Sequence, residues 1–151
     1  MKNVNLFSVV ASRSRFGSKR LSLLLQGHPT GIQLRGTQFV DQYSNGQRYI
    51  LLTADPDRVD ETLYIYLMDL ELNLIDELAI TQPISHQGYR PHLHPGEYLE
   101  FRYFNDGLWR LQVRHHPKSQ PLNLDHFPVQ RPIKLWGQQY LRLEKLSAVM
   151  A

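Results

Sequence analysis

The segment from residue 97 to residue 114 alternates between apolar and polar side chains on both sides of one turn signal, and this pattern constrains the fold most strongly. The turn signal is Asn105-Asp106-Gly107, which suits a three-residue hairpin loop with Gly107 in the left-handed conformation. We predict that the flanking residues form antiparallel strands, one side of which is buried. The apolar side chains that share this side are Leu99, Phe101, Tyr103, Trp109, Leu111 and Val113.

The length of the loop also predicts which residues lie opposite each other in this hairpin. The expected pairs are Tyr103 with Trp109, Phe101 with Leu111, and Leu99 with Val113. On the solvent side, Arg102 is expected to face Arg110, and Glu100 lies diagonally near Arg110, where it relieves the repulsion between the arginines.

A second hairpin is predicted around Ser44-Asn45-Gly46-Gln47. Asn45 and Gly46 suit the two positive-φ positions of a type I′ turn. The strand from Gly31 to Tyr43 would then pair with the strand from Arg48 to Ala54.

The run from Glu61 to Ile80 suits either a helix or a pair of strands. Its leucines and tyrosines recur at helical spacing, but its first half is rich in aromatic and β-branched residues. Leu70, Leu72 and Leu74 also alternate with polar residues. We favour a third hairpin that turns near residues 71–73, and a helix is the alternative.

Further strands are predicted at both ends of the chain. The pairs are Asn5 to Ser12 with Leu21 to Gln26, and Pro132 to Trp136 with Gln138 to Leu146 around Gly137. Prolines exclude central strands from residues 81–96 and 115–132, which we predict to be long loops. The predicted fold is therefore mainly β, an antiparallel meander that closes into a small barrel or sandwich, with little helix.

The length of 151 residues suits one β-rich domain over residues 1–151. The chain has no cysteine, which excludes disulfides and thiol nucleophiles and favours a reducing compartment. The apolar run from Leu6 to Ala11 is too short for a signal-peptide core or a membrane span, so we expect a cytoplasmic protein. Residues 1–20 share the basic, serine-rich composition of mitochondrial transit peptides, but the β pattern that follows directly favours a folded segment.

Charge is distributed unevenly along the chain. Residues 1–40 contain six basic residues and no acid, and residues 41–106 contain twelve acids against four bases. Residues 107–151 contain seven bases against two acids. The outer segments either pack beside the acidic middle or form a basic face for an acidic partner.

One loop concentrates positive charge around an aromatic residue. It runs from Arg13 to Arg20 and contains the candidate partner-binding residues Arg13, Arg15, Phe16, Lys19 and Arg20. Three interpretations are open: a solvated loop, a contact with an acidic protein surface, or a contact with nucleic acid in which Phe16 stacks on a base.

Seven histidines occur in the chain, and His86, His92, His94, His115 and His116 lie in the proline-rich segments. His92 and His94 are two residues apart, so in extended backbone they project to the same side and could chelate a divalent metal. The stretch Pro91-His92-Leu93-His94-Pro95-Gly96-Glu97 resembles the first motif of the cupins. Cupins are small β-barrels that bind a metal through two histidines and a following glutamate. The resemblance implies a metal site at His92, His94 and Glu97, with His115 as a further candidate ligand, but the second cupin motif is missing.

No catalytic motif is present: the chain has no nucleophile elbow, no phosphate-binding glycine loop and no paired catalytic carboxylates. We therefore expect a non-catalytic binding module that recognises a protein partner through long loops and charged segments. Tyrosine and arginine are favoured interface anchors, which makes Tyr89, Arg90, Tyr98 and Arg102 candidate partner-binding residues. The alternatives are a cupin-like metal-binding protein, a nucleic-acid-binding protein, and a barrel with a small apolar ligand inside.

Overall fold

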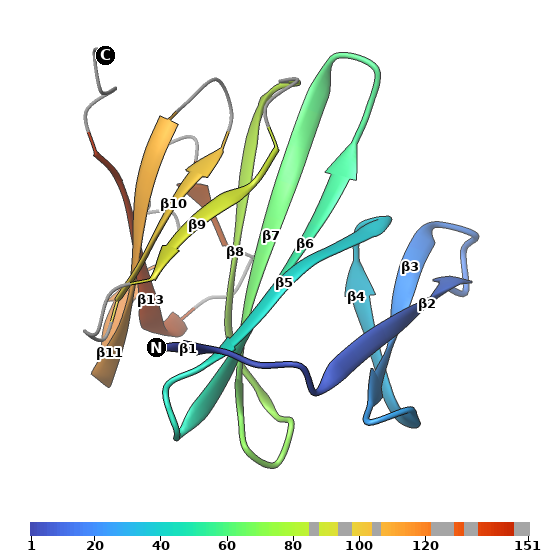
Figure 1. Ribbon diagram of the computed structural model, residues 1–151, viewed down its shortest axis with the longest axis horizontal. Helices are drawn as coiled ribbons and strands as arrows, with labels where there is room; N and C mark the ends of the chain where they lie inside the picture. Colours follow the sequence, from blue (N-terminus) through green and yellow to red (C-terminus); the bar gives the residue numbers. More distant parts are fainter. Residues whose placement is uncertain (85–87, 94–97, 104–106, 122–128, 132–135, 147–151) are drawn as a thin grey trace.

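The computed structural model describes residues 1–84, 88–93, 98–103, 107–121, 129–131 and 136–146, and every regular element in these ranges is a β-strand (Figure 1). A six-stranded sheet contains, in order, β1 (Lys2–Asn3), β5 (Gln38–Ser44), β6 (Arg48–Pro56), β7 (Asp60–Asp69), β8 (Leu74–Pro83) and β12 (Val129–Gln130). A four-stranded sheet contains β13 (Trp136–Leu146), β11 (Gly107–Pro121), β10 (Tyr98–Tyr103) and β9 (Arg90–Leu93). A three-stranded sheet contains β2 (Phe7–Arg13), β3 (Lys19–Leu25) and β4 (His28–Arg35).

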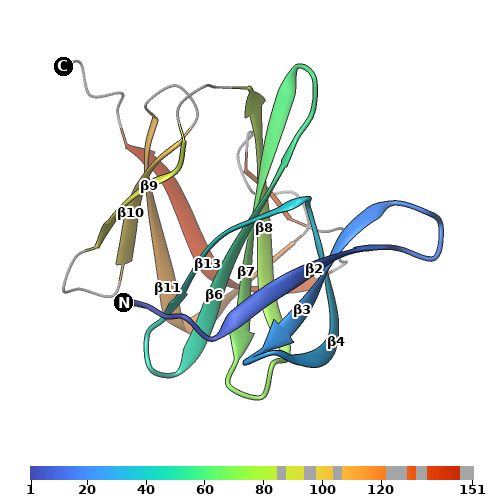
Figure 2. The same cartoon turned by 45° about the vertical axis from the view of Figure 1, so that its right-hand side comes forward.

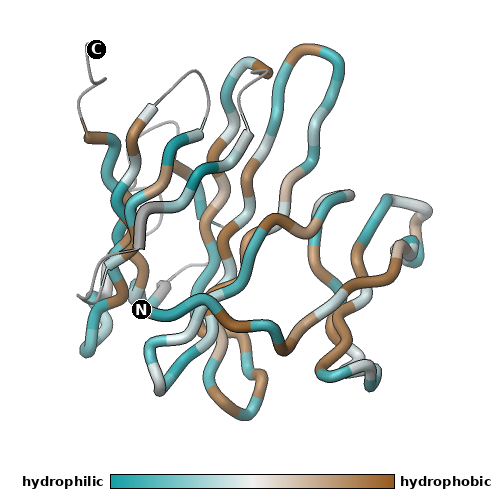
Figure 3. The backbone as a smooth tube through the Cα atoms, in the orientation of Figure 1, coloured by the Kyte–Doolittle hydropathy of each residue, from teal (hydrophilic) through white to brown (hydrophobic). Residues whose placement is uncertain are grey.

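The prediction of a mainly β, antiparallel fold is confirmed. No sheet closes into a barrel within the described ranges, and the sheets instead pack face to face in a sandwich-like arrangement (Figures 1 and 2). The hydropathy of the chain follows this arrangement, since hydrophobic stretches lie along the strands where sheets pack together (Figure 3). Among the described residues, no helix has the length and apolarity needed to cross a membrane.

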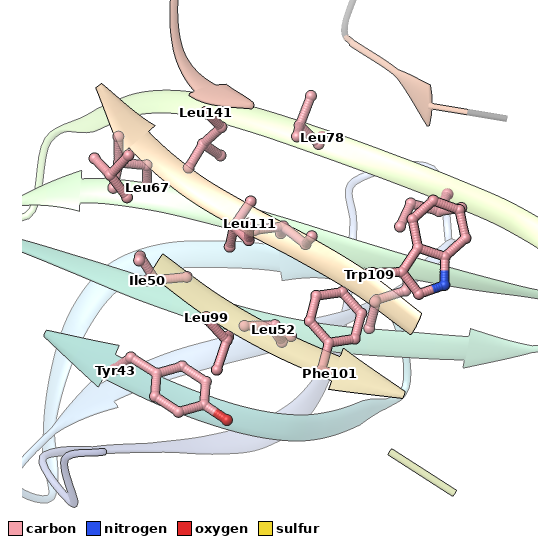
Figure 4. Packing of buried hydrophobic residues seen from close by; sticks show 14 of the residues in the cluster. Tyr43, Ile50, Leu52, Leu67, Leu78, Leu99, Phe101, Trp109, Leu111 and Leu141 are labelled. Atoms are coloured by element: carbon pink, nitrogen blue, oxygen red, sulfur yellow. The ribbon is translucent and has the colours of Figure 1, made fainter. Parts of the chain in front are cut away.

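The six-stranded sheet is covered on both faces. One face packs against the four-stranded sheet, where Ile50 and Leu52 lie near Phe101 and Leu111 in a single buried cluster (Figure 4). The neighbouring residue Leu51 points to the opposite face and packs against the three-stranded sheet. The molecule therefore has two hydrophobic cores, one on each side of a shared sheet.

This double coverage explains why residues 61–80 were ambiguous in sequence. In β7 the residues from Ile65 to Met68 are all buried, and in β6 so are those from Ile50 to Ala54. A strand buried on both faces loses its apolar and polar alternation and looks like a continuous apolar run. The predicted hairpin is confirmed as β7 and β8, and its turn holds Leu72 at a φ of 66°.

The hairpin of residues 97–114 is confirmed as β10 and β11, and all six predicted apolar side chains are buried. The predicted register was wrong by two residues, because Phe101 pairs with Trp109 and Tyr103 pairs with Gly107. A shift of two keeps the same face inward. It also places Glu100 opposite Arg110, where Arg102 was expected. The Nη2 and Nε atoms of Arg110 donate hydrogen bonds to Glu100 Oε1 at 2.7 and 3.1 Å. The predicted loop residues 104–106 lie outside the described residues.

The hairpin around Asn45 and Gly46 is confirmed as β5 and β6, but its turn is not type I′. Gly46 has a φ of 90°, whereas Asn45 is not among the residues with positive φ. Asn45 instead accepts hydrogen bonds at Oδ1 from the backbone N–H groups of Gln47 (3.0 Å) and Arg48 (2.8 Å), and so stabilises the turn with its side chain.

The predicted single strand from residue 31 to residue 43 is divided in the structure. Gly36 has a φ of 105°, and the chain turns there from β4 in the three-stranded sheet to β5 in the six-stranded sheet. A left-handed backbone interrupts the extended conformation of a strand, and glycine adopts it without a steric penalty.

The terminal strands and loops were predicted in part. β2 and β3 confirm the first pair. Trp136–Leu146 is one continuous strand that pairs with β11, so the turn predicted at Gly137 is wrong. Residues 132–135 of the predicted strand from Pro132 to Trp136 lie outside the described residues. β11 continues into the predicted loop as far as Pro121. Its pairing with β13 is irregular between Val113 and Lys118, and Pro117 is tolerated there because an irregular position needs no N–H donor for the partner strand. The expected loop of residues 81–96 likewise contains β9.

Candidate binding surface

The β2–β3 hairpin brings together the predicted basic loop. Arg13 lies directly opposite Lys19 in the strand pairing, and Arg20 follows at the next position. Arg15 and Phe16 lie in the connecting loop, and the side chain of Phe16 is 91% exposed. Figure 2 shows this hairpin projecting beyond the six-stranded sheet. All five predicted residues therefore lie at one end of the molecule, and we call residues 13–20 the basic hairpin tip.

The loop of the basic hairpin tip is held by hydrogen bonds of its own. The backbone N–H of Ser14 donates to Ser18 O at 2.7 Å, and the N–H of Gly17 donates to Ser14 O at 2.9 Å. Arg13 Nη1 donates to Gly17 O at 3.0 Å, and Gly17 has a φ of 85°. The cations are therefore presented by a backbone of defined conformation.

An open groove of about 380 Å³ lies between the basic hairpin tip and the β4–β5 connection at residues 36–37. Arg13, Lys19 and Arg20 line it. The Oγ atom of Ser12, also in the lining, is buried and has no hydrogen-bond partner among the described residues. Three cations suit an anionic group such as a carboxylate.

The far wall of this groove is held rigidly. The N–H of Arg35 donates to the Tyr66 hydroxyl at 2.8 Å, and Thr53 Oγ1 donates to Arg35 O at 2.6 Å. Burial raises the pKa of Tyr66, against the opposing effect of the Arg35 N–H, so this hydroxyl remains protonated at neutral pH. A side chain at Gly36 would place its Cβ 2.9 Å from Ala54 O.

Replacing Gly36 with Ala is expected to lower the free energy of unfolding by roughly 2–4 kcal/mol. The strain of a positive φ and the contact with backbone atoms of β6 both contribute to this loss. Urea unfolding measured by circular dichroism gives the difference directly.

Gly88 provides the matched control for this substitution. A Cβ at Gly88 meets nothing within 4 Å, and its φ is not in the positive region. Gly88→Ala should therefore change the free energy of unfolding by less than about 0.5 kcal/mol. Equal effects of the two substitutions would contradict the role assigned to Gly36.

The second predicted group of partner-binding residues lies on the four-stranded sheet, away from the basic hairpin tip (Figures 1 and 2). Arg90 is exposed and pairs in register with Arg102 of β10. Tyr98 is half-buried, and the guanidinium of Arg110 lies 5.0 Å from its ring centroid. The structure thus separates the predicted residues into two surfaces.

Tyr89, the fourth member of this group, lies against the hydrophobic core. Its ring centroid is 5.5 Å from that of Phe101 and 6.2 Å from that of Tyr103. Its hydroxyl is 2.5 Å from the hydroxyl of Tyr43, which in turn donates to Asp41 Oδ2 at 2.6 Å. Burial raises the pKa of both Tyr43 and Tyr89. Both hydroxyls are therefore protonated, and Tyr89 donates to Tyr43.

The predicted metal ligands fall largely outside the described residues. His94 and Glu97 are not described, and of His92 only the backbone is described, in β9 opposite Glu100. Within the described ranges, no group of three or more His, Cys, Asp or Glu side chains is arranged to hold a metal ion.

The sequence did not reveal the other wall of the groove. Gly36 and Thr37 were predicted to lie inside the strand from Gly31 to Tyr43, and nothing in their neighbourhood relates them to the basic loop. They reach the groove because the chain crosses between two sheets at that point.

A buried ion pair was also not predicted. Asp76 is 5% exposed and accepts hydrogen bonds from Arg131 Nε (3.2 Å) and from the N–H of Leu141 (2.9 Å). A signal was present in the sequence, because Asp76 occupies the inward side of β8 together with Leu78 and Ile80. A charged residue in such a position requires buried partners.

Comparisons with known proteins give no assignment: the chain matches no protein-family model, and no curated protein or solved structure is significantly similar to it.

Proposed function

We propose that the protein is a non-catalytic binding module that recognises an acidic surface of a partner protein through the basic hairpin tip. The observation that carries the proposal is the grouping of Arg13, Arg15, Lys19 and Arg20 around the exposed ring of Phe16, beside an open groove. Cations pair with carboxylates, and an exposed aromatic side chain supplies apolar contact area in an interface.

The charges of the basic hairpin tip are not neutralised within the described chain. Residues 1–40 contain no acid, and none of the four cations of the tip forms an ion pair with a described residue, whereas Arg110, Arg131 and Arg142 each do. The positive potential of the tip is therefore available to a partner, and it would also accelerate association.

A protein partner is favoured over single-stranded nucleic acid by the distribution of aromatic side chains. Phe16 is the one fully exposed aromatic residue among the described side chains. Proteins that bind single strands present several aromatic rings on which successive bases stack. One ring suits a single apolar contact at the centre of a charged interface.

The proposal predicts the outcome of affinity capture from native extract with the full chain as bait. One variant has Ala in place of Arg13, Arg15, Lys19 and Arg20 and therefore loses four charge-assisted contacts. The amount of partner that it captures, measured by quantitative mass spectrometry, should be at least about tenfold lower than the amount captured by the unmodified chain. Capture should weaken as salt increases and should survive treatment with nucleases.

The control removes the same charge elsewhere on the surface. It carries Ala at Lys2, Arg58, Lys118 and Lys145, which are exposed in the structure and belong to neither group of candidate partner-binding residues. This variant should capture the partner as well as the unmodified chain does. Equal capture by all three proteins, or no specific capture, would contradict the proposal, and loss of capture after nuclease treatment would indicate nucleic acid instead.

A further inference from the structure

β2 is an edge strand whose outward hydrogen-bonding groups can be identified. The N–H of Gln26 donates to Leu6 O at 2.7 Å, and the N–H of Ser14 donates to Ser18 O at 2.7 Å. In an antiparallel pair, the residues that bond to the partner strand alternate with residues that point away from it. The even-numbered residues of β2 therefore bond to β3, and the odd-numbered residues point their N–H and C=O groups outward.

The first of these outward positions already has a strand-like partner. The N–H of Phe7 donates to Gln42 Oε1 at 2.8 Å, and Gln42 Nε2 donates to Phe7 O at 2.9 Å. The buried side-chain amide of Gln42 thus takes the place of a neighbouring strand. Further along β2, no described strand lies beside Val9, Ala11 and Arg13, since β2 is the last strand of its sheet.

The other edges of the described sheets are protected against pairing. β4 contains Pro29, and its pairing with β3 has an irregular register. β9 contains Pro91, and β1 and β12 have two residues each. β13 carries alternating charges, including Arg142 and Glu144. β2 has seven residues, with no proline, no glycine and no charge before Arg13. Long, regular and uncharged edges are normally avoided because they pair with other chains.

We infer that β2 accepts an extended acidic segment of the partner protein as an additional strand of the three-stranded sheet, an inference that rests on the proposed function. Residues of the added strand would alternate between two environments. One set would face the cationic groove of Arg13 and Lys19, and the other set would lie beside Val10, which is 54% exposed. The segment is therefore one in which acidic and apolar residues alternate.

A second copy of this chain does not fit the same edge. Pairing β2 with its own copy would bring together two β2–β3 hairpins that each carry Arg13, Lys19 and Arg20 and no acid. Like charges held close together oppose association. The charge of the basic hairpin tip at the end of this edge therefore favours an acidic occupant over self-pairing.

The test uses a fluorescein-labelled peptide of alternating Glu and Val, with binding to the full chain measured by fluorescence anisotropy. Ala11→Pro removes one outward N–H donor but leaves the bonds between β2 and β3, so it should weaken peptide binding at least about tenfold. Ala11→Val retains the N–H and should bind as the unmodified chain does. A peptide of the same sequence with alternate backbone nitrogens methylated on its pairing edge should not bind.

Amide hydrogen exchange provides a measurement that needs no substitution. On addition of the Glu and Val peptide, exchange at Val9, Ala11 and Arg13 should slow, whereas the amides of Val10 and Ser12 are already bonded to β3 and should change little. Unchanged exchange at the odd-numbered positions would overturn the inference even if Ala11→Pro fails to fold.

The outcomes separate this inference from the proposed function. If Ala11→Pro binds the peptide normally but the variant lacking Arg13, Arg15, Lys19 and Arg20 does not, strand addition is wrong and the basic hairpin tip still recognises acidic groups. If the latter variant also binds normally, the proposed function is wrong as well. No binding of the Glu and Val peptide to the unmodified chain overturns strand addition, and the capture experiment then decides the proposed function alone.

Discussion

Replacing Asp76 with Ala is expected to lower the free energy of unfolding by about 3–5 kcal/mol, because it leaves the guanidinium of Arg131 buried without its carboxylate. Asp76 Oδ2 accepts from the N–H groups of Tyr140 (3.0 Å) and Leu141 (2.9 Å) of β13. Arg131 Nη2 also donates to Leu141 O at 2.5 Å. One carboxylate thus joins β8 of the six-stranded sheet to the edge of the four-stranded sheet, and its loss removes several hydrogen bonds at once.

Chemical denaturation of the full chain measures this loss. The control is Glu71→Ala, which removes an exposed carboxylate from the β7–β8 turn and should change stability by less than about 0.5 kcal/mol. Asp76→Asn should give an intermediate loss, since the amide oxygen still accepts a hydrogen bond but carries no charge. A stability of Asp76→Ala equal to that of the control would show that the buried network contributes little.

Replacing Phe101 with Ala is expected to lower the free energy of unfolding by about 3–5 kcal/mol as well, for a different reason. Phe101 is fully buried between the two larger sheets, beside Trp109 on the neighbouring strand and the ring of Tyr89 (Figure 4). Removal of the ring loses its burial and leaves a cavity that well-packed neighbours fill only in part.

Gln112 provides the comparison for Phe101, because it lies on the other face of the same hairpin and is half-exposed. Gln112→Ala should cost less than about 1 kcal/mol. The pair of substitutions therefore tests the alternation of buried and solvent-facing residues across β10 and β11, and similar losses in both variants would contradict it. Thermal unfolding monitored by near-ultraviolet circular dichroism measures both variants.

The alternation that predicted the β10–β11 hairpin could not determine its register. Side chains repeat every two residues in a strand, so registers that differ by two residues bury the same six side chains. The choice between them depended on the contact of Glu100 with Arg110 and on the neighbouring strands β9 and β13. The contacts with β9 and β13 come from outside the hairpin, so its own alternation does not contain them.

The candidate binding surface shows the same division. The cations of residues 13–20 were recognisable in sequence, because their charge and spacing are local properties. The groove was not, since its other wall comes from residues 36–37, where Gly36 turns the chain between two sheets. The free edge of β2 was equally hidden, because it depends on which strands lie beside β2 and on the side chain of Gln42.

The sequence by itself determined where most strands and turns lie and which side chains of the β10–β11 hairpin face inward, because turn chemistry and side-chain alternation act between residues close in the chain. Only the tertiary structure decided that β6 and β7 are covered on both faces, that Asp76 meets Arg131, and that β2 is left with an open edge. These features depend on how whole sheets pack against one another, and packing between distant segments leaves little trace in local sequence patterns.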